Sequence, residues 1–102
     1  MKYMKTQIHS VHFDADKKLL TLIEKKCKYL TRFFNGIIGI DVFLSISKDA
    51  SLNKVVEIKL DVARNILIAK EQERTFEEAL HTCINVLARQ LVKHKEKLRS
   101  RK

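Results

Sequence analysis

Residues 75–102 read TFEEALHTCINVLARQLVKHKEKLRSRK, and this stretch organises the rest of the chain. It opens with a capping box, in which the Thr75 hydroxyl and the Glu78 carboxylate satisfy free backbone donors at a helix start. Apolar residues then recur at helical spacing and form one stripe: Phe76, Leu80, Cys83, Leu87, Leu91 and Leu98. No proline or glycine interrupts them, so the stretch predicts one helix of about twenty or more residues.

The character of this helix changes at Arg89. From Arg89 to Lys102 the only acid is Glu96 among seven basic residues, so this part carries +6 of the chain's formal net charge of +9. The first half of the helix has the pattern of a core element. The second half has the composition of a surface that binds a polyanion, with nucleic acid as the first candidate.

The N-terminal third predicts a strand followed by a helix. Residues 6–13 contain β-branched and aromatic residues without a helical period, which favours a strand. Asp14 is the predicted N-cap of the helix, with Asp16 in its first turn. The apolar stripe consists of Leu19, Leu20, Ile23, Cys27, Leu30 and Phe34. The pair Asn35-Gly36 predicts the end of this helix.

The middle of the chain predicts three more strands. Residues 37–48 and 54–62 alternate between apolar and polar side chains, and residues 49–53 form the loop between them. Residues 63–65 suit a hairpin turn, because the asparagine tolerates the left-handed conformation. Residues 66–73 have a weaker pattern, typical of an edge strand.

The order β-α-β-β-β-α predicts an α+β fold with two layers. We expect a four-stranded mixed sheet with both helices packed on one face, and a right-handed crossover that makes the first two strands parallel. A chain of 102 residues supports one core, so residues 1–102 are predicted to form a single domain. Cys27 and Cys83 lie on apolar stripes, which favours buried free thiols over a disulfide.

The sequence lacks the residues that several classes of function require. With only two glycines, the chain cannot build a glycine-rich phosphate loop, and it has no spacing typical of a metal site. His9 and His12 should point to opposite faces of a strand. We therefore predict no enzyme, cofactor or metal. The sequence also lacks a signal-peptide pattern and a membrane-length apolar run, so we expect a cytoplasmic protein.

The candidate binding residues lie on two basic surfaces, one on each predicted helix. On the first helix, Lys18, Lys25 and Arg32 line up seven apart with Lys28 beside them, which indicates either a solvated face or a binding face. On the second helix the candidates are Arg89, Lys93, Lys95, Lys97 and Arg99. His94 lies on the apolar stripe among lysines, so it is either a packing histidine or a contact to RNA or phosphate. Residues 99–102 are expected to form a flexible basic tail.

Four segments of this sequence resemble a known family. They are KTQIHSVHFDADKKLLTLIEKK at 5–26, IIGIDVFLSIS at 37–47, AKEQERTFEEAL at 69–80 and, most specifically, LARQLVKHKEKL at 87–98. Together they resemble the ribosome hibernation promoting factor family, also called ribosome-associated inhibitor or sigma-54 modulation protein, from residue 4 to about residue 99.

The resemblance implies a function and a site. It implies binding to rRNA of the small ribosomal subunit in the decoding channel, which blocks mRNA and tRNA under stress or in stationary phase. Arg89, Lys93, Lys95 and Lys97 match the rRNA-contacting positions of the family. Lys25, Lys28 and Arg32 correspond less specifically to its first-helix basic surface. Because the chain stops at Lys102, it looks like the short form, without a domain that dimerises ribosomes.

The residues themselves lead to a similar expectation with less detail. Two basic helix faces on one side of a sheet suit recognition of phosphates and shape in folded RNA, since only Phe43 on the polar sheet face is placed for base stacking. The alternatives are a free-standing double-stranded-RNA-binding domain and a basic regulator that binds an acidic protein. We expect a monomer when free, with no membrane or small-molecule partner.

Overall fold

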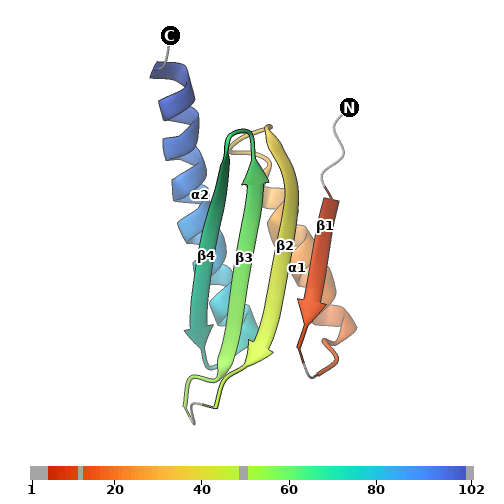
Figure 1. Ribbon diagram of the computed structural model, residues 1–102. Coiled ribbons are helices and arrows are strands. Elements are labelled where there is room, and N and C mark those ends of the chain that lie inside the picture. The colour runs from red at the N-terminus through yellow and green to blue at the C-terminus, as the bar shows by residue number, and fades with distance from the viewer. Residues whose placement is uncertain (1–4, 12, 49–50, 101–102) are drawn as a thin grey trace.

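The computed structural model describes residues 5–11, 13–48 and 51–100 of the 102-residue chain. Its elements follow the predicted order β-α-β-β-β-α (Figure 1). Their bounds are β1 Lys5–Ser10, α1 Lys17–Leu30, β2 Ile37–Ile46, β3 Lys54–Val62, β4 Asn65–Glu73 and α2 Phe76–Ser100. The type and order of the expected elements are therefore confirmed.

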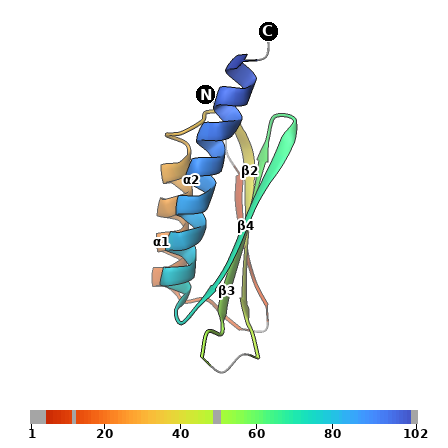
Figure 2. The same cartoon turned by 90° about the vertical axis from the view of Figure 1, so that its left-hand side faces the viewer.

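The four strands form one sheet whose spatial order is the order in the sequence, β1-β2-β3-β4. β1 pairs with β2 in parallel, whereas the β2–β3 and β3–β4 pairs are antiparallel. Both helices lie on the same side of the sheet (Figure 2). This is the predicted α+β fold with two layers and a mixed sheet, and α1 forms the crossover that makes the first two strands parallel.

The core lies between the sheet and the helices. Alternate residues of the central strands, such as Val42 and Ile58, are fully buried and pack in one cluster with Ile23 of α1 and Leu87 of α2. Removing each such side chain from water contributes roughly 1.5–3 kcal/mol. Burial of the two helix stripes is therefore the main force that holds the helices on the sheet.

The two cysteines belong to this cluster, as predicted. Cys27 and Cys83 are both 0% exposed, and both thiols are free. The Cys83 thiol donates a hydrogen bond to the Val56 carbonyl oxygen at 3.3 Å. Burial, followed by the nearby Glu24 carboxylate, raises the pKa of Cys27 to about 12. Burial and the Glu71 carboxylate raise the pKa of Cys83 to about 12. Both thiols are therefore protonated at neutral pH.

The helices run in the same direction, so their C-terminal ends lie at one end of the molecule (Figures 1 and 2). The connection from α1 to β2 and the hairpin between β3 and β4 lie at this end too. α2 continues past the sheet, which contributes to overall dimensions of 49 × 26 × 17 Å. The opposite end contains the starts of both helices and the connection between β2 and β3.

The bounds of α1 differ from the expectation at both ends. Asp16, not Asp14, is the N-cap, because its carboxylate reaches the Leu19 amide at 2.8 Å. The helix ends at Leu30 and not at Asn35-Gly36. The amides of residues 32 and 33 donate to carbonyl groups three residues earlier, at 3.1 Å, which closes the helix with tight turns. Gly36 has no positive φ, so it does not act as a left-handed C-cap.

The strands also differ in detail. β1 ends at Ser10 and β2 at Ile46, two or three residues earlier than expected. Val62 pairs with Asn65, which leaves residues 63 and 64 as a two-residue loop. The left-handed residue is therefore Arg64, with φ 69°, and not Asn65, whose side chain accepts the Ile66 N–H at 2.8 Å. His12 and residues 49–50 lie outside the described residues.

The start of α2 has one half of the predicted capping box. The Thr75 hydroxyl oxygen accepts the Glu78 N–H at 3.1 Å, as predicted. The Glu78 carboxylate accepts from the Thr75 hydroxyl at 3.1 Å, where the prediction had a backbone donor. The apolar stripe is buried from Leu80 to Leu91, whereas Phe76 is partly buried. Leu98 is also only partly buried, because α2 has passed the end of the sheet there. Leu98 is thus not the core residue that the pattern predicted. Residues 101–102 of the predicted tail lie outside the described residues.

Candidate nucleic-acid interface

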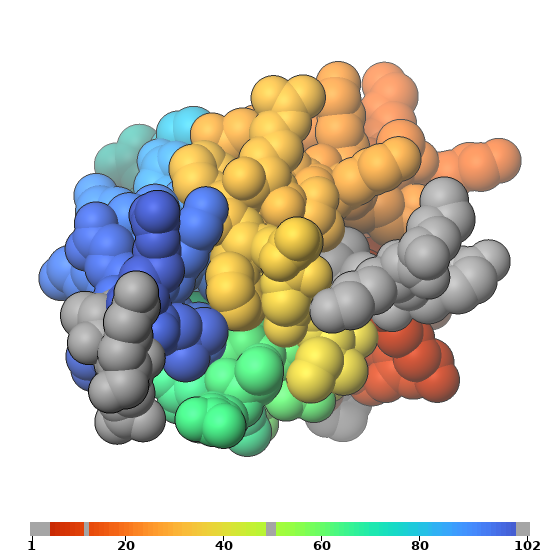
Figure 3. All heavy atoms as spheres, turned by 90° about the horizontal axis from the view of Figure 1, so that it is seen from above, coloured from red at the N-terminus to blue at the C-terminus, as the bar shows by residue number. Residues whose placement is uncertain are grey.

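The structure brings the basic residues of both helices to one end of the molecule. Because the helices are parallel, the last turns of α1 and the second half of α2 lie side by side there (Figure 3). We call this surface the basic end. It is defined by nine exposed cations: Lys25, Lys28, Arg32, Arg64, Arg89, Lys93, Lys95, Lys97 and Arg99.

The cations of the basic end are mostly unneutralised. The ion pair between His9 and Asp41, at 3.3 Å, lies on the other side of the sheet. No described acidic side chain pairs with Lys25, Arg32 or Arg89. Glu96 is the one acidic residue in the second half of α2. The cationic field of this surface is therefore available to an external anion.

Helix geometry accounts for part of this placement. Cations near a helix C-terminus interact favourably with the negative end of the helix dipole, typically by about 0.3–1 kcal/mol. Lys28 lies in the last turn of α1, and Lys97 and Arg99 lie in the last turn of α2. This local effect does not explain the positions of Lys25, Arg89 and Lys93, which lie further from the helix ends. A cluster of cations that the helix dipole does not account for is typical of a surface that binds an anion.

Lys18 is the predicted site residue that the structure separates from the others. It lies near the start of α1, seven residues and about 10 Å along the helix axis from Lys25. It shares a shallow hollow with Lys17, Thr21, Leu22 and Lys25, away from the α2 cations. Lys18 therefore belongs to the outer face of α1 but not to the basic end.

His94 is placed in the packing of α2. It is 8% exposed, and its ring meets the Phe34 ring edge to face with centroids 5.2 Å apart. Its Nε2 atom is buried and has no hydrogen-bond partner among the described residues. The structure thus favours the packing histidine over the direct RNA or phosphate contact. Phe34 lies beyond the end of α1, yet it still reaches the core from the connection to β2.

Arg64 is a basic residue that the sequence pattern did not single out. It is exposed at the tip of the β3–β4 hairpin, which lies at the same end as the C-terminal half of α2 (Figures 1 and 3). A positive φ in a residue with a Cβ costs roughly 1–2 kcal/mol. The signal was present as an Ala-Arg-Asn turn between two strands, but the asparagine was the more obvious candidate for the left-handed position.

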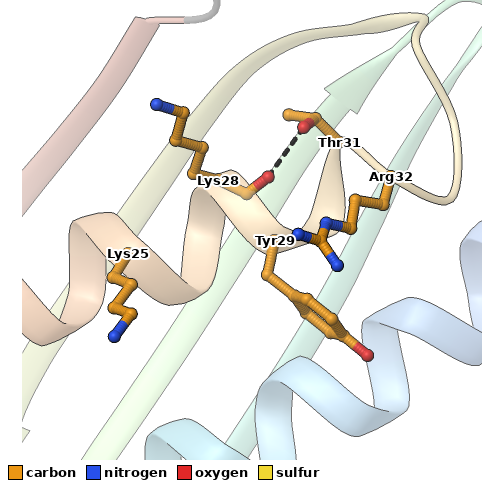
Figure 4. Close-up of a pocket in the computed structure, with 5 residues that line it drawn as sticks. All are labelled: Lys25, Lys28, Tyr29, Thr31 and Arg32. Carbon is orange, nitrogen blue, oxygen red and sulfur yellow. Dashed lines mark hydrogen bonds between the residues drawn. The ribbon is translucent and has the colours of Figure 1, made fainter.

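Tyr29 of α1 is an exposed aromatic residue that the sequence pattern did not single out. Tyr29 is 42% exposed and, with Lys25, Lys28, Thr31 and Arg32, lines an open hollow of about 360 Å³ (Figure 4). The Arg32 guanidinium lies 6.0 Å from the centre of the Tyr29 ring. Phe43, which the sequence pattern did single out for stacking, already has neighbours on the sheet. Its ring is stacked on His9 at 4.7 Å, and the Lys59 ammonium lies 5.5 Å from its centre.

The described residues offer neither a metal site nor a membrane-spanning helix. Among the described residues, no group of three or more His, Cys, Asp or Glu side chains could hold a metal ion. In the same part of the chain, no helix is both long enough and apolar enough to span a membrane.

This fold, with two parallel helices on one face of a four-stranded mixed sheet, is that of a known class of small α+β proteins. The family model described as sigma 54 modulation protein / S30EA ribosomal protein matches residues 6–99. The chain belongs to this family.

Individual relatives support the assignment. A ribosome hibernation promoting factor from Azotobacter vinelandii is 29% identical over 94 residues, which cover 92% of this chain and 85% of that protein. A ribosomal subunit interface protein from Coxiella burnetii superposes with a TM-score of 0.79 at 24% identity, covering 91% of this chain and 99% of that one. The N-terminal domain of Thermus thermophilus Protein Y gives a TM-score of 0.74 at 19% identity, covering 92% and 99%. At these identities the two structures show a common fold.

Proposed function

We propose that this protein is a ribosome hibernation factor, which binds rRNA of the small ribosomal subunit through its basic end. Membership of the S30EA family and the name of the Azotobacter vinelandii relative support a role in ribosome hibernation. The observation that carries the binding mode is the convergence of two helices' cations on one end of the fold. In this mode the protein acts by occupying a site and not by catalysis.

The arrangement suits folded RNA. Cations on two parallel helices can contact phosphates on both sides of a narrow groove or channel, and the release of counterions supplies most of the affinity. Such contacts read the shape of an RNA more than its sequence. Placed in the decoding channel of the small subunit, the domain would exclude mRNA and tRNA sterically.

The two alternatives fit the structure less well. A double-stranded-RNA-binding domain starts its second helix with lysines, whereas α2 starts with Glu77 and Glu78 and carries its cations at the far end. The additional strand β1 is also an integral, parallel member of this sheet. A basic regulator of an acidic protein shares the charge but not the family, and it becomes an outcome of the test below.

The test is cosedimentation of the purified protein with purified small ribosomal subunits on a sucrose gradient. Reversing Arg89, Lys93 and Lys97 to Glu turns +3 into −3 on one flank of α2. All three side chains are exposed, so each change should alter stability by no more than about 0.5 kcal/mol. This variant should remain folded, leave the subunit fraction and fail to inhibit translation in a cell-free extract.

A matched variant separates position from net charge. Lys17, Lys48 and Arg74 are exposed cations near the opposite end, and their reversal to Glu changes the net charge by the same amount. This control should still sediment with small subunits. If the α2 variant is folded and inhibits at wild-type concentrations, the proposed site is wrong. If the wild-type protein stays at the top of the gradient in the presence of subunits, the ribosome-binding function fails and the basic regulator of an acidic protein becomes the better hypothesis.

A further inference from the structure

An exposed apolar strip separates the cations of the two helices at the basic end. Tyr29 of α1 is 42% exposed and Val92 of α2 is 41% exposed. Phe33 lies partly buried and meets the Tyr29 ring edge to face, with centroids 5.2 Å apart. Phe33 and Val92 then line a second hollow of about 390 Å³, together with Ala88, Arg89, Lys93 and Glu96. We call the strip formed by Tyr29, Phe33, Ala88 and Val92 the interhelical groove.

Cations border this groove on both sides. Lys25, Lys28 and Arg32 line the same hollow as Tyr29 on the α1 side, where Figure 4 shows the ring extending from the helix with the Arg32 guanidinium beside it. Arg89 and Lys93 border the groove on the α2 side. An apolar floor between two cationic rims suits a ligand that is flat and apolar in the middle and anionic along its chain.

The surroundings of the Tyr29 ring distinguish this groove from the sheet. Phe43, the aromatic residue that the sequence pattern offered for stacking, already packs on His9 and lies under the Lys59 ammonium. Tyr29 has an edge-to-face neighbour in Phe33, and the Arg32 guanidinium lies 6.0 Å from the centre of its ring. Among the described residues no ring is stacked parallel on Tyr29, so a planar base can stack there beside the Arg32 guanidinium without displacing another ring.

We propose that the interhelical groove binds one unstacked nucleotide of rRNA, with its base against Tyr29 and its flanking phosphates on the two cationic rims. This inference rests on the proposed function and adds a base contact to a surface otherwise built for phosphates. Proteins that recognise RNA commonly stack splayed bases on tyrosine rings or on arginine planes. A hollow of this volume falls in the range of small-ligand sites.

The first experiment measures affinity for small ribosomal subunits at several salt concentrations. Tyr29→Ala should weaken binding on the order of tenfold or more, which is the usual loss for one stacked base. Because Tyr29 carries no charge, the slope of log affinity against log salt should stay unchanged. Lys25→Ala should instead lower that slope by roughly 0.7–0.9, the change for one phosphate contact.

Two variants serve as controls. Tyr29→Phe keeps the ring and should bind like the wild type. Ile68→Ala removes a similarly exposed apolar side chain, 47% exposed on β4, and should also bind like the wild type. Thermal unfolding of each variant establishes that it is folded.

The second experiment detects the base itself. The chain has no tryptophan, so Tyr29→Trp creates a single fluorescent reporter. Its emission should be quenched by a short oligoadenylate and left nearly unchanged by an abasic ribose-phosphate chain of equal length and charge. Equal responses to the two chains would overturn the base site.

The outcomes distinguish this inference from the function on which it rests. If the wild type binds subunits and Tyr29→Ala binds equally well, the base site is wrong and the proposed function stands. If Tyr29→Ala lowers the salt slope as Lys25→Ala does, the ring acts by positioning Arg32, and the base site is also wrong. If the wild type does not bind subunits at all, the proposed function fails first.

Discussion

The two halves of α2 share one continuous helix but differ in what they contact. In the first half, Ala79, Leu80, Cys83, Ile84 and Leu87 are buried against the sheet. Among residues 89–99 of the second half, only Leu91 and His94 are buried, while Leu98 is partly buried and the cations are exposed. The first half therefore supplies stability, whereas the second half can change its charge at little cost to folding. The difference shows how one element combines a structural role with a charged surface that is open to a partner.

The largest effect on stability should come from the first half. Leu87→Ala removes a fully buried side chain and should cost about 2–5 kcal/mol of unfolding free energy. For a domain of this size, that loss corresponds to a fall in melting temperature of at least about 8 °C. Leu98→Ala should cost clearly less, and Lys93→Ala no more than about 0.5 kcal/mol. Equal losses at Leu87 and Leu98 in thermal unfolding would contradict the division of the helix.

The reactivity of the buried Cys83 thiol tests whether the first half of α2 is packed in the core. Because the pKa of Cys83 in the folded protein is about 12, compared with 9.0 for a free thiol, its thiolate is about a thousandfold scarcer at pH 8. Iodoacetamide should therefore label the native protein slowly and the denatured protein quickly. Rapid labelling of the native protein would move Cys83 out of the core.

The sign of the linked stability effect follows from the raised pKa. Unfolding releases a thiol that ionises more readily, so the stabilising contribution is complete below pH 9 and is lost as the pH rises toward about 12. The free energy of unfolding should therefore fall over this window. A Cys27→Ala, Cys83→Ala double variant should be less stable at pH 8 but show a shallower alkaline fall than the wild type.

The second half of α2 should determine the salt dependence of binding. Replacing Arg89, Lys93 and Lys97 by Ala should lower the slope of log affinity against log salt by roughly two to three. The measurement is subunit affinity between low and physiological salt. An unchanged slope in a folded triple variant would show that these side chains do not meet phosphates.

The smallest effect is expected at the hairpin tip. Arg64→Asn keeps a residue that tolerates a positive φ and removes one charge at the basic end. We expect this variant to be slightly more stable in thermal unfolding and to bind subunits with a salt slope lower by up to about 0.9. Arg74→Asn, at the opposite end, is the matched control for the slope. If Arg74→Asn changes the salt slope and Arg64→Asn does not, the bound phosphates lie at the end opposite to the basic end, and the proposed site is wrong.

Sequence periodicity was sufficient for the elements that bury one face. The alternation around Val42 and Ile58, and the capping box at Thr75, predict their elements because burial and capping act locally. The ends of α1 were harder, since Asp14 and Asp16 are both good caps. Phe34 also continues the helical spacing although it packs from a connection. In these cases tertiary contacts decide between local conformations of similar energy.

The candidate site was predictable only in part. The basic composition of residues 89–99 and of α1 is visible in the sequence, but their meeting at one end depends on two helices being parallel. Arg64 and the interhelical groove depend on the same placement, because their partners come from separate elements. Lys18 shares the sequence spacing of Lys25 and Arg32, yet the length of α1 removes it from the basic end.

The parallel helices also affect the rate at which the protein finds its partner. The molecule is 49 Å long and carries its excess positive charge at one end, so it has an electric dipole moment along its long axis. In the field of a polyanion, such a molecule tends to rotate its cationic end forward before contact, so more diffusional encounters begin in a productive orientation. Charge steering of this kind can raise association rates by 10–10³-fold and is lost as salt increases.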